Sequence, residues 1–529
     1  MLAAPAGAPC RATPMNDPVE TEFKLRASGP LEVAAVDASL RALASVRASS
    51  SRRHVDTYFD DDRGSLRAAG IGLRLRRSDD GAVLCCKGRA RVVEGRFERS
   101  ELALPWPHAT VPQRAAELPP ELADRVEPFT RLRPLQPFLE LATWRDARIV
   151  THAEHDVCEL VVDQVTASAD GRSVAFAEVE LEVFDDLATT EQLATALRQH
   201  LPLQPAEQDK PTHAAGLLGL LPPTVAPAPW TGATPLGEAL RGIVAAHGAS
   251  LLAAEAAVRG GDGAAALHTL RVALRRLRSL VRSCRDAWPV ERAERALQCL
   301  AELGRTCGSC RDHDVMLELV GDGLAHLPSA LRPGGDAALQ QLREQRDAAT
   351  ATLQRQLRTA EHLQQLDALF ADLDAIGHDG AAANTPLAAA LPHHFAPAIA
   401  RVRKLVEKLP AELPLLAVHE LRLAVKRLRY LAEEFAELPG HDYGRSLAAL
   451  TTLQQALGGV CDAEAAAERL AHTATTGGDA AQAAVFGALA MWQHHRAGRA
   501  RNAAGKALAK VDRKKVWRRF PAADADAPS

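Results

Sequence analysis

Polar and hydrophobic residues alternate one by one in several segments of the first 220 residues. Near the start of this region, Glu20, Glu22 and Lys24 alternate with Phe23 and Leu25. Successive side chains of a β-strand point to opposite faces of its sheet, so the three charged residues share one face. The same kind of pattern predicts strands over 19–26, 54–60, 71–77, 82–87, 95–104, 141–151, 157–165 and 174–184.

Two stretches between these strands have a helical pattern instead, over 31–46 and 187–200. Turn signals such as Asp170-Gly171 separate many of the strands. Eight strands, several of them with a charged face, predict an α+β domain that contains a closed, eight-stranded antiparallel barrel with a polar interior.

The pattern changes after a Pro-rich segment that we interpret as a linker. Beyond it, apolar residues recur with the helical period, which predicts an all-α domain. A motif that begins at His268 is repeated at His419, an offset of about 150 residues, so we expect a pair of helical bundles. The predicted organisation is a disordered leader over 1–17, a barrel domain over 18–220, the linker over 221–236, a helical domain over 237–515 and a tail over 516–529.

Composition narrows the class of protein. The net charge of the 529 residues is only −3, which hides a local separation of basic and acidic segments. Aromatic residues make up 4% of the chain, so stacking platforms for single-stranded nucleic acid are not expected. No long apolar stretch predicts a membrane span. The nine cysteines are scattered, and an odd number of scattered thiols is typical of a cytoplasmic protein.

Charge also alternates on several other predicted strands. Arg74 and Arg76 share one face, and so do Glu178, Glu180 and Glu182. On a single strand this pattern usually marks a solvent-facing side. Six such strands, some basic and some acidic, favour a cavity with a cationic wall and an acidic wall. Arginine and lysine bind phosphate oxygens, and carboxylates bind Mg²⁺ or Mn²⁺, so the cavity suits hydrolysis of a polyphosphate chain.

At these residues the first domain resembles the CYTH family of triphosphate tunnel metalloenzymes. The resemblance rests on Glu20-x-Glu22-x-Lys24, Tyr58-Phe59-Asp60, Gly72-Leu73-Arg74-x-Arg76, Lys87, Arg99-x-Glu101, Arg145, Asp163, Glu178-x-Glu180-x-Glu182 and Lys210. It implies a tunnel that binds a triphosphate together with Mg²⁺ or Mn²⁺. One difference is that the family often has Ser-Lys-Tyr where this chain has Asp209-Lys210-Pro211, so Asp209 could pair with Lys210.

The resemblance also implies a role for each charged residue. The catalytic residues would be Glu20, Glu22, Lys24, Glu178 and Glu180. The metal ligands would come from Glu20, Glu22, Asp163, Glu178, Glu180 and Glu182. The triphosphate would be held by Lys24, Arg74, Arg76, Lys87, Arg99, Arg145 and Lys210.

The helical half carries two stripes of basic residues. Spacings of three and four place each stripe within about a quarter of the helix circumference. One such stripe is usually a solvated face, but its repetition favours a surface that binds a polyanion. We expect this surface to bind inorganic polyphosphate, with nucleic acid as the less favoured partner. The stripes are His268, Arg271, Arg275, Arg278 and Arg282, and His419, Arg422, Lys426 and Arg429.

Here the chain resembles the CHAD domain, also through Arg311-Asp312-x-Asp314-Val315 and Leu453-Gln454-x-x-Leu457-Gly458. The resemblance implies two four-helix bundles around a basic groove, with polyphosphate as the ligand. We assign no metal role to the pairs His393-His394 and His494-His495. Cys307-Gly-Ser-Cys310 is compatible with a redox-active pair or half of a zinc site, but no second pair stands at metal spacing, and we interpret it as a loop.

Three functions are compatible with these patterns. The first is a cytoplasmic, metal-dependent hydrolase of inorganic triphosphate fused to a polyphosphate-binding module. The second is a class IV-type adenylate cyclase or a thiamine triphosphatase, since the same tunnel can hold ATP or thiamine triphosphate. The third is a non-catalytic protein that associates with polyphosphate granules.

Overall fold

The computed structural model describes residues 19–27, 29–93, 95–220, 230–261, 263–377, 382–436, 438, 444–476, 479–511, 514–517 and 520. They form two compact units, the first before and the second after a division near residue 227. The predicted leader and most of the predicted linker and tail lie outside the described residues. The predicted domain limits therefore stay predictions.

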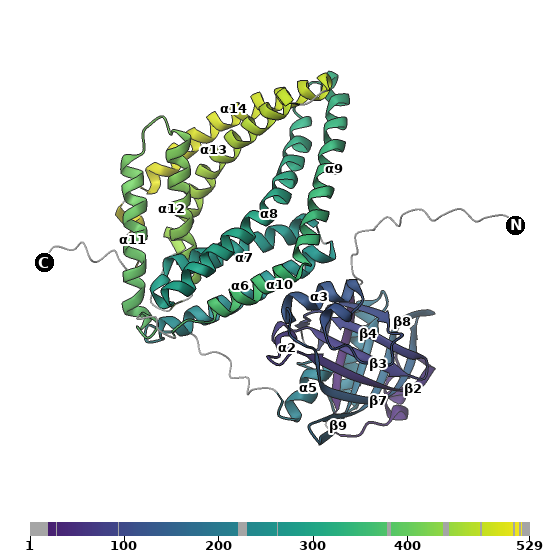
Figure 1. Ribbon diagram of the computed structural model, residues 1–529. Helices are drawn as coiled ribbons and strands as arrows, with labels where there is room; N and C mark the ends of the chain where they lie inside the picture. Colours follow the sequence, from purple (N-terminus) through teal and green to yellow (C-terminus); the bar gives the residue numbers. More distant parts are fainter. Residues whose placement is uncertain are drawn as a thin grey trace. The chain divides into compact units, whose positions relative to one another are not determined.

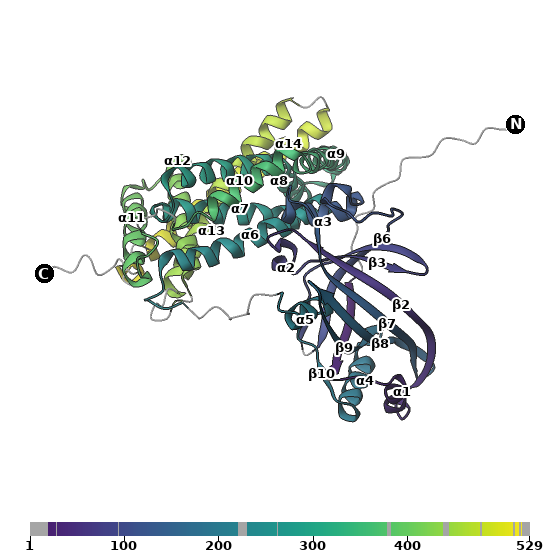
Figure 2. The same cartoon turned by 60° about the horizontal axis from the view of Figure 1, so that its bottom comes forward.

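The first unit contains one antiparallel sheet, which the described residues build from ten strands (Figures 1 and 2). The strands are β1 (Val19–Ala27), β2 (Ser45–Asp60), β3 (Gly72–Ser78), β4 (Gly81–Lys87), β5 (Arg91–Val93), β6 (Arg96–Pro105), β7 (Gln136–His152), β8 (His155–Ala169), β9 (Arg172–Val183) and β10 (Leu203–Pro205). Their order is β10-β1-β9-β8-β7-β2-β3-β4-β6-β5, and β1 also pairs with β6. This last pairing closes eight of the described strands into a ring, which confirms the predicted antiparallel tunnel barrel.

Several predicted ranges were wrong at their ends. The helix expected over 31–46 is the short α1 (Val33–Leu40), and β2 begins at Ser45 rather than at residue 54. The reason is tertiary, because β7 is long enough to pair with β2 from Ser45 to Asp60. The helix α3 (Pro120–Thr130) was not predicted, since it begins at a proline and contains a second one.

Short helices complete this unit. An apolar cluster under α1 and α4 (Leu187–His200) covers the outer face of the sheet, with Leu160, Val179 and Leu193 in its centre. Inside the ring, α5 (Lys210–Leu217) packs Ala214 against inward-facing residues of β2, β7 and β8 and so closes one end. The remaining short elements are α2 (Ser65–Ala69) and η1 (Ala115–Glu117).

Asp60 holds the turn between β2 and α2. Its buried carboxylate accepts hydrogen bonds from the backbone N–H groups of Asp61, Leu66 and Arg67 at 2.8 to 3.1 Å. Asp60→Ala would leave these donors without a partner, so we expect the free energy of unfolding of the first unit to fall by about 3 kcal/mol. Urea unfolding measures this loss. The exposed Asp62→Ala serves as the control, and an equal loss in both variants would contradict the capping role.

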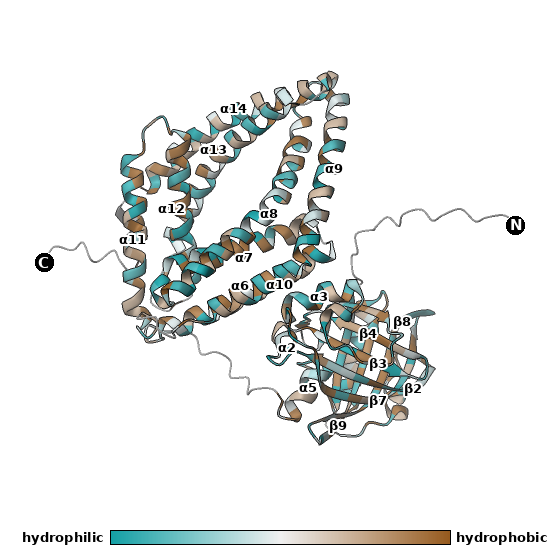
Figure 3. Ribbon diagram, viewed as in Figure 1, coloured by the Kyte–Doolittle hydropathy of each residue, from teal (hydrophilic) through white to brown (hydrophobic). Residues whose placement is uncertain are grey.

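The second unit is helical, and Figure 1 shows its long helices. Its α-helices are α6 (Leu236–Gly260), α7 (Gly263–Ser283), α8 (Val290–Leu324), α9 (Arg332–Leu357), α10 (Ala360–Leu373), α11 (Leu387–Lys408), α12 (Leu415–Glu434), α13 (Gly444–Thr476), α14 (Ala480–Val511) and α15 (Lys514–Trp517). Two 3₁₀ turns join them, η2 (Arg285–Ala287) and η3 (Ser329–Leu331). Figure 3 shows hydrophobic and hydrophilic residues in turn along these helices. On α7, for example, Leu267, Leu270 and Leu274 recur at the helical period and are buried.

The sequence repeat corresponds to two helical bundles, as predicted. The first residues of the bundles pair with each other, because Leu236 N–H donates to Thr385 O and Leu387 N–H donates to Thr234 O, both at 2.9 Å. At the far end, α8, α9, α13 and α14 share an apolar cluster around Val485. The two bundles are therefore joined at both ends.

Two further predictions concern cysteines and membranes. Cys307 and Cys310 lie inside the helix α8 and not in a loop, so the loop interpretation was wrong. Both thiols are buried, and every cysteine among the described residues is free.

In the part of the chain that the structure describes, no helix has the length and apolar character to cross a membrane.

Candidate functional site

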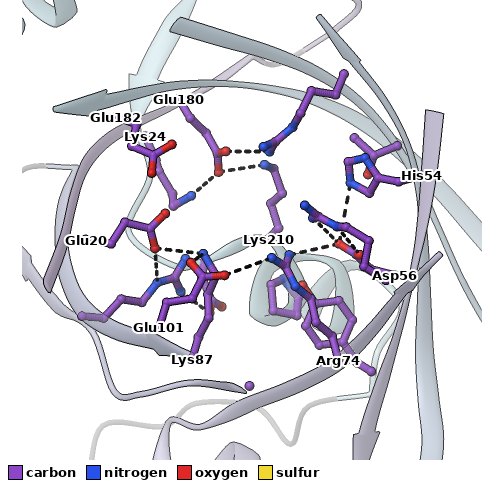
Figure 4. A pocket seen from close by; sticks show the side chains of 18 of the residues that line it. Glu20, Lys24, His54, Asp56, Arg74, Lys87, Glu101, Glu180, Glu182 and Lys210 are labelled. Carbon is purple, nitrogen blue, oxygen red and sulfur yellow. Dashed lines mark hydrogen bonds and ion pairs between the residues drawn. The ribbon is translucent and has the colours of Figure 1, made fainter. Parts of the chain in front are cut away.

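Charged side chains from the strands of the ring line a cavity of about 230 Å³. Figure 4 shows the labelled side chains, such as Glu180, Lys210 and Arg74, turned toward a common centre. Those on strands project inward because charged residues at alternate positions of each strand share its inner face, whereas Lys210 is the first residue of α5. The predicted residues that line the cavity are Glu20, Lys24, Arg74, Arg76, Lys87, Arg99, Arg145, Glu180, Glu182 and Lys210.

Glu180 lies at the meeting point of three cations. Lys24 donates a short hydrogen bond to it, Lys210 Nζ lies 2.7 Å away and Arg145 donates at 2.8 Å. Burial would raise the pKa of Glu180, but Lys210, Lys24 and Arg145 hold it well below its usual value. Glu180 therefore stays ionised and fixes three basic groups around the cavity.

Asp56 organises the cationic wall. Arg74 donates to its Oδ2 at 3.0 Å, and Arg76 bonds to both of its oxygens at 2.7 and 2.8 Å. Behind Arg145, the fully buried Asp163 accepts from Arg145 and from Lys210. Each carboxylate fixes the direction of two cations and leaves the other guanidinium or ammonium hydrogens for a ligand.

Basic residues also hold the end of the site near β6. Lys87 bonds to Glu20 at 2.9 Å, and Arg99 bonds to Glu22 at 3.0 Å. Asp209 lies 3.2 Å from Arg99 rather than pairing with Lys210, so that sequence-based alternative was wrong. Its other oxygen accepts from Thr212 N–H and caps α5.

An acidic wall faces the cations. Across neighbouring strands, Glu182 is paired in register with Glu22 of β1 and with Glu159 of β8. Burial, and then Glu22 and Glu159, raise the pKa of Glu182. Burial and the charge of Glu22 also raise the pKa of Glu20 to about 7. A bound cation would offset the repulsion between carboxylates that raise one another's pKa in this way. Oxygen ligands of this kind suit Mg²⁺ or Mn²⁺.

The residues present therefore fit a divalent metal by their chemistry. Among the described residues, no three Asp, Glu, His or Cys side chains converge as a ready set of ligands. Several of the carboxylates contact lysine or arginine instead. One buried oxygen, Oε1 of Glu178, has no hydrogen-bond partner within the described part of the chain.

The raised pKa of Glu20 predicts a pH effect on stability. Between its unfolded pKa of 4.5 and about 7, the folded state keeps a proton that the unfolded chain releases. The free energy of unfolding therefore falls as the pH rises through this window, by on the order of 2 kcal/mol from this group. Urea unfolding at pH 5 and pH 7.5 measures the fall. We expect a smaller fall in Glu20→Gln than in the wild type, and equal falls would contradict this assignment.

Three predicted residues lie behind the cavity surface. Glu22, Asp163 and Glu178 are buried and do not belong to its lining, although each contacts a basic residue of the site. The catalytic and metal-binding roles of all these residues stay predictions. The lining also includes residues that we did not assign: Arg52, His54, Asp56, Tyr58, Gly72, Glu101, Thr143, Glu159, Asp209 and Pro211.

In the second unit, the two basic stripes lie on α7 and α12, which pack against each other. Burial, and then Arg275 and Arg422, lower the pKa of Lys426 to about 8. Arg275 belongs to α7 and Arg422 to α12, which is consistent with the packing of these helices and brings the two stripes to one region. Arg271, Arg275 and Arg278 also line a cavity of about 270 Å³ between α7 and α8.

The members of the stripes differ in their partners. Arg422 bonds to Asp462 at 2.8 Å, and Arg429 bonds to Glu433. Among the described residues, Arg275, Arg278 and Lys426 have no carboxylate partner, and Nε of Arg275 and of Arg278 is buried without a hydrogen bond. A group of cations that lacks local counter-charges is typical of a surface that binds an external anion.

Comparison with known proteins agrees with this division. Residues 19–215 match the family model of the CYTH domain, and residues 242–471 match that of the CHAD domain. Two curated relatives from Mycobacterium tuberculosis, the uncharacterized proteins MT2285 and Rv2226, are each 26% identical over 292 residues. The match covers 52% of this chain and 54% of theirs, so the chain spans about half the length of these relatives.

Several solved structures match parts of this chain. The CHAD domain from the plant Ricinus communis is 22% identical and covers 55% of this chain and 96% of its own, with a TM-score of 0.45. PptA from Streptomyces chartreusis is 23% identical, with 52% and 100% coverage and a TM-score of 0.44. HpAC1 from Hippeastrum, described as a putative adenylyl cyclase with a dominant triphosphatase activity, is 17% identical, with 39% and 98% coverage and a TM-score of 0.27.

Proposed function

Because this chain joins a CYTH domain to a CHAD domain, we propose that its first unit hydrolyses inorganic triphosphate and that its second unit binds inorganic polyphosphate. The first activity would depend on Mg²⁺ or Mn²⁺. The observation that carries the proposal is the convergence of the seven predicted phosphate-binding residues with an acidic wall on one cavity of about 230 Å³: Lys24, Arg74, Arg76, Lys87, Arg99, Arg145 and Lys210.

The size and lining of the cavity favour an inorganic substrate. Apart from His54, Tyr58 is the one aromatic side chain among the described residues that line it, and only 6% of Tyr58 is exposed. A purine or thiazole ring would therefore have no stacking surface there. A chain of phosphates, in contrast, offers an acceptor oxygen to each guanidinium and ammonium group.

The geometry suggests how the site would act. Arg74 and Arg76, held by Asp56, would bind phosphate oxygens of the chain, and Arg145 and Lys210 would bind others. Such fixed cations stabilise the charge that develops during phosphoryl transfer without reorganising. The metal, held by residues among Glu20, Glu22, Glu178, Glu180 and Glu182, would neutralise phosphate charge and lower the pKa of a bound water.

The α7–α12 surface supports the second half of the proposal. Arg275, Arg278 and Lys426, which have no carboxylate partner among the described residues, lie on two helices that pack against each other. Such a group of cations suits a long anion that is bound without base recognition. We assign polyphosphate binding to the two stripes, with Arg275 and Lys426 at the point where they converge.

One assay separates the candidate functions. The purified chain is incubated with tripolyphosphate, ATP or thiamine triphosphate in the presence of Mg²⁺ or Mn²⁺, and phosphate and cyclic AMP are measured. Phosphate released from tripolyphosphate alone supports the proposal. Cyclic AMP would identify a cyclase, and phosphate from thiamine triphosphate would identify a thiamine triphosphatase. No turnover, with retention on polyphosphate, would leave only the binding function.

A further inference from the structure

A histidine lies in the middle of the cationic wall. His54 of β2 lines the cavity, and only 3% of it is exposed. Its ladder partners are Ser78, the last residue of β3, and Thr143 on β7. Figure 4 shows its ring next to Asp56. Nε2 is 3.7 Å from Asp56 Oδ2, which is too long for a hydrogen bond.

Charged groups on four strands influence the charge of this ring. They are Asp56 on β2, Arg76 on β3, Arg145 on β7 and Asp163 on β8. Burial, and then Arg76, lower the pKa of His54 to about 3, against the opposite effect of Asp56. Asp56 and Asp163 act in the opposite direction but do not cancel this lowering, and both are bonded to arginine. Without a ligand the imidazole is therefore neutral at neutral pH.

Building on the function proposed above, we propose that His54 is a further catalytic residue of the triphosphate site. It hydrogen-bonds to the bound phosphate chain, takes up one proton when the chain binds, and donates that proton to the bridging oxygen of the leaving diphosphate. This role goes beyond the phosphate-binding lysines and arginines, because those groups hold their protons too tightly to act as acids near pH 7.

The charge of the substrate explains the proton uptake. A triphosphate bound to Arg76 and Arg145 would place several negative charges beside the imidazole. These charges reverse the local field and favour the imidazolium form, as a neighbouring anion does for any histidine. Binding and protonation of His54 are thus coupled through the same two arginines.

The chemical step then balances. The oxygen of a water molecule forms a bond to the terminal phosphorus while the bond from this phosphorus to the bridging oxygen breaks. The bridging oxygen keeps the electron pair and receives the proton of His54. One proton of the water passes to solvent, and His54 returns to its neutral form. General acids of this kind accelerate reactions by about 10²- to 10⁴-fold.

Calorimetry tests proton uptake without turnover. Imidotriphosphate, which resists hydrolysis, is titrated into the full chain at pH 7 in two buffers of different ionisation enthalpy. We expect the wild type to take up about one proton more than His54→Gln on binding. His155→Gln, at the exposed turn between β7 and β8, is the matched control and should behave as the wild type. Equal proton uptake by His54→Gln and the wild type would overturn the proposal.

Kinetics test proton donation. We expect His54→Gln to lower kcat for tripolyphosphate by about 100-fold with little change in KM. In a second substrate, the two phosphorus atoms of the leaving diphosphate are joined by a difluoromethylene bridge. This leaving group departs without a proton, so His54→Gln should hydrolyse the second substrate at nearly the wild-type rate. A kcat within threefold of the wild type would overturn the inference.

Two further measurements separate the possible failures. If the wild type released no phosphate from tripolyphosphate, the proposed function would fail, and the calorimetry would still decide whether His54 is protonated on binding. If His54→Gln did not fold, ¹⁵N-histidine NMR of the wild type would replace it. One ring should change from the neutral to the protonated pattern when imidotriphosphate is added, and no change would contradict the proposal.

Discussion

Replacing Glu180 by glutamine should abolish the hydrolysis of tripolyphosphate, with a loss in kcat of at least about 10³-fold. Glutamine keeps the size of the side chain but removes the charge that fixes Lys24, Arg145 and Lys210. These three cations would then repel one another, and their positions around the substrate would be lost. Phosphate release from tripolyphosphate measures the effect.

The exposed Glu191→Gln on α4 is the control for this variant, since it makes the same chemical change away from the cavity. Binding of long-chain polyphosphate by the second unit should be the same in Glu180→Gln, Glu191→Gln and the wild type. A Glu180→Gln rate within threefold of the wild type would show that the cavity is not the site of hydrolysis.

The second large effect concerns the helical unit. Arg275→Glu combined with Lys426→Glu should weaken the binding of labelled polyphosphate on the order of 100-fold. Both positions lie where the stripes of α7 and α12 converge, so two new carboxylates would repel the phosphate chain there. The rate of tripolyphosphate hydrolysis should not change.

A charge-matched control is available on α11. Lys404→Glu with Lys408→Glu alters the net charge by the same amount on exposed positions outside both stripes. We expect this control to lower polyphosphate binding only slightly, through the long-range field. If both double variants weakened binding equally, net charge alone would explain it and the stripes would have no special role.

The sequence predicted the parts of the fold that depend on local pattern. Strands β1 and β9 carry the clearest alternation of charged and apolar residues, and their limits were close to those observed. The closed barrel, the helical repeat and both family resemblances were also confirmed. These features succeed because side-chain direction follows directly from the period of a strand or helix.

Features that depend on distant partners were harder to predict. The start of β2 is defined by its pairing with β7, and the short β5 and β10 exist only because β6 and β1 lie beside them. The site residues His54 and Asp56 were missed although they share one face of β2 with Tyr58. The same alternation that identified Glu20 and Glu22 could have found them.

The closed ring also restricts how a polymer can reach the site. β1 pairs with β6 and completes the ring, and α5 packs against inward-facing residues of the strands, so a continuous wall of strands surrounds the cavity. We expect a linear phosphate chain to enter such a ring by one end, so the proposed hydrolysis would be confined to chain termini. A cyclic trimetaphosphate has no terminus and should resist the enzyme, whereas long linear chains should shorten by steps from one end.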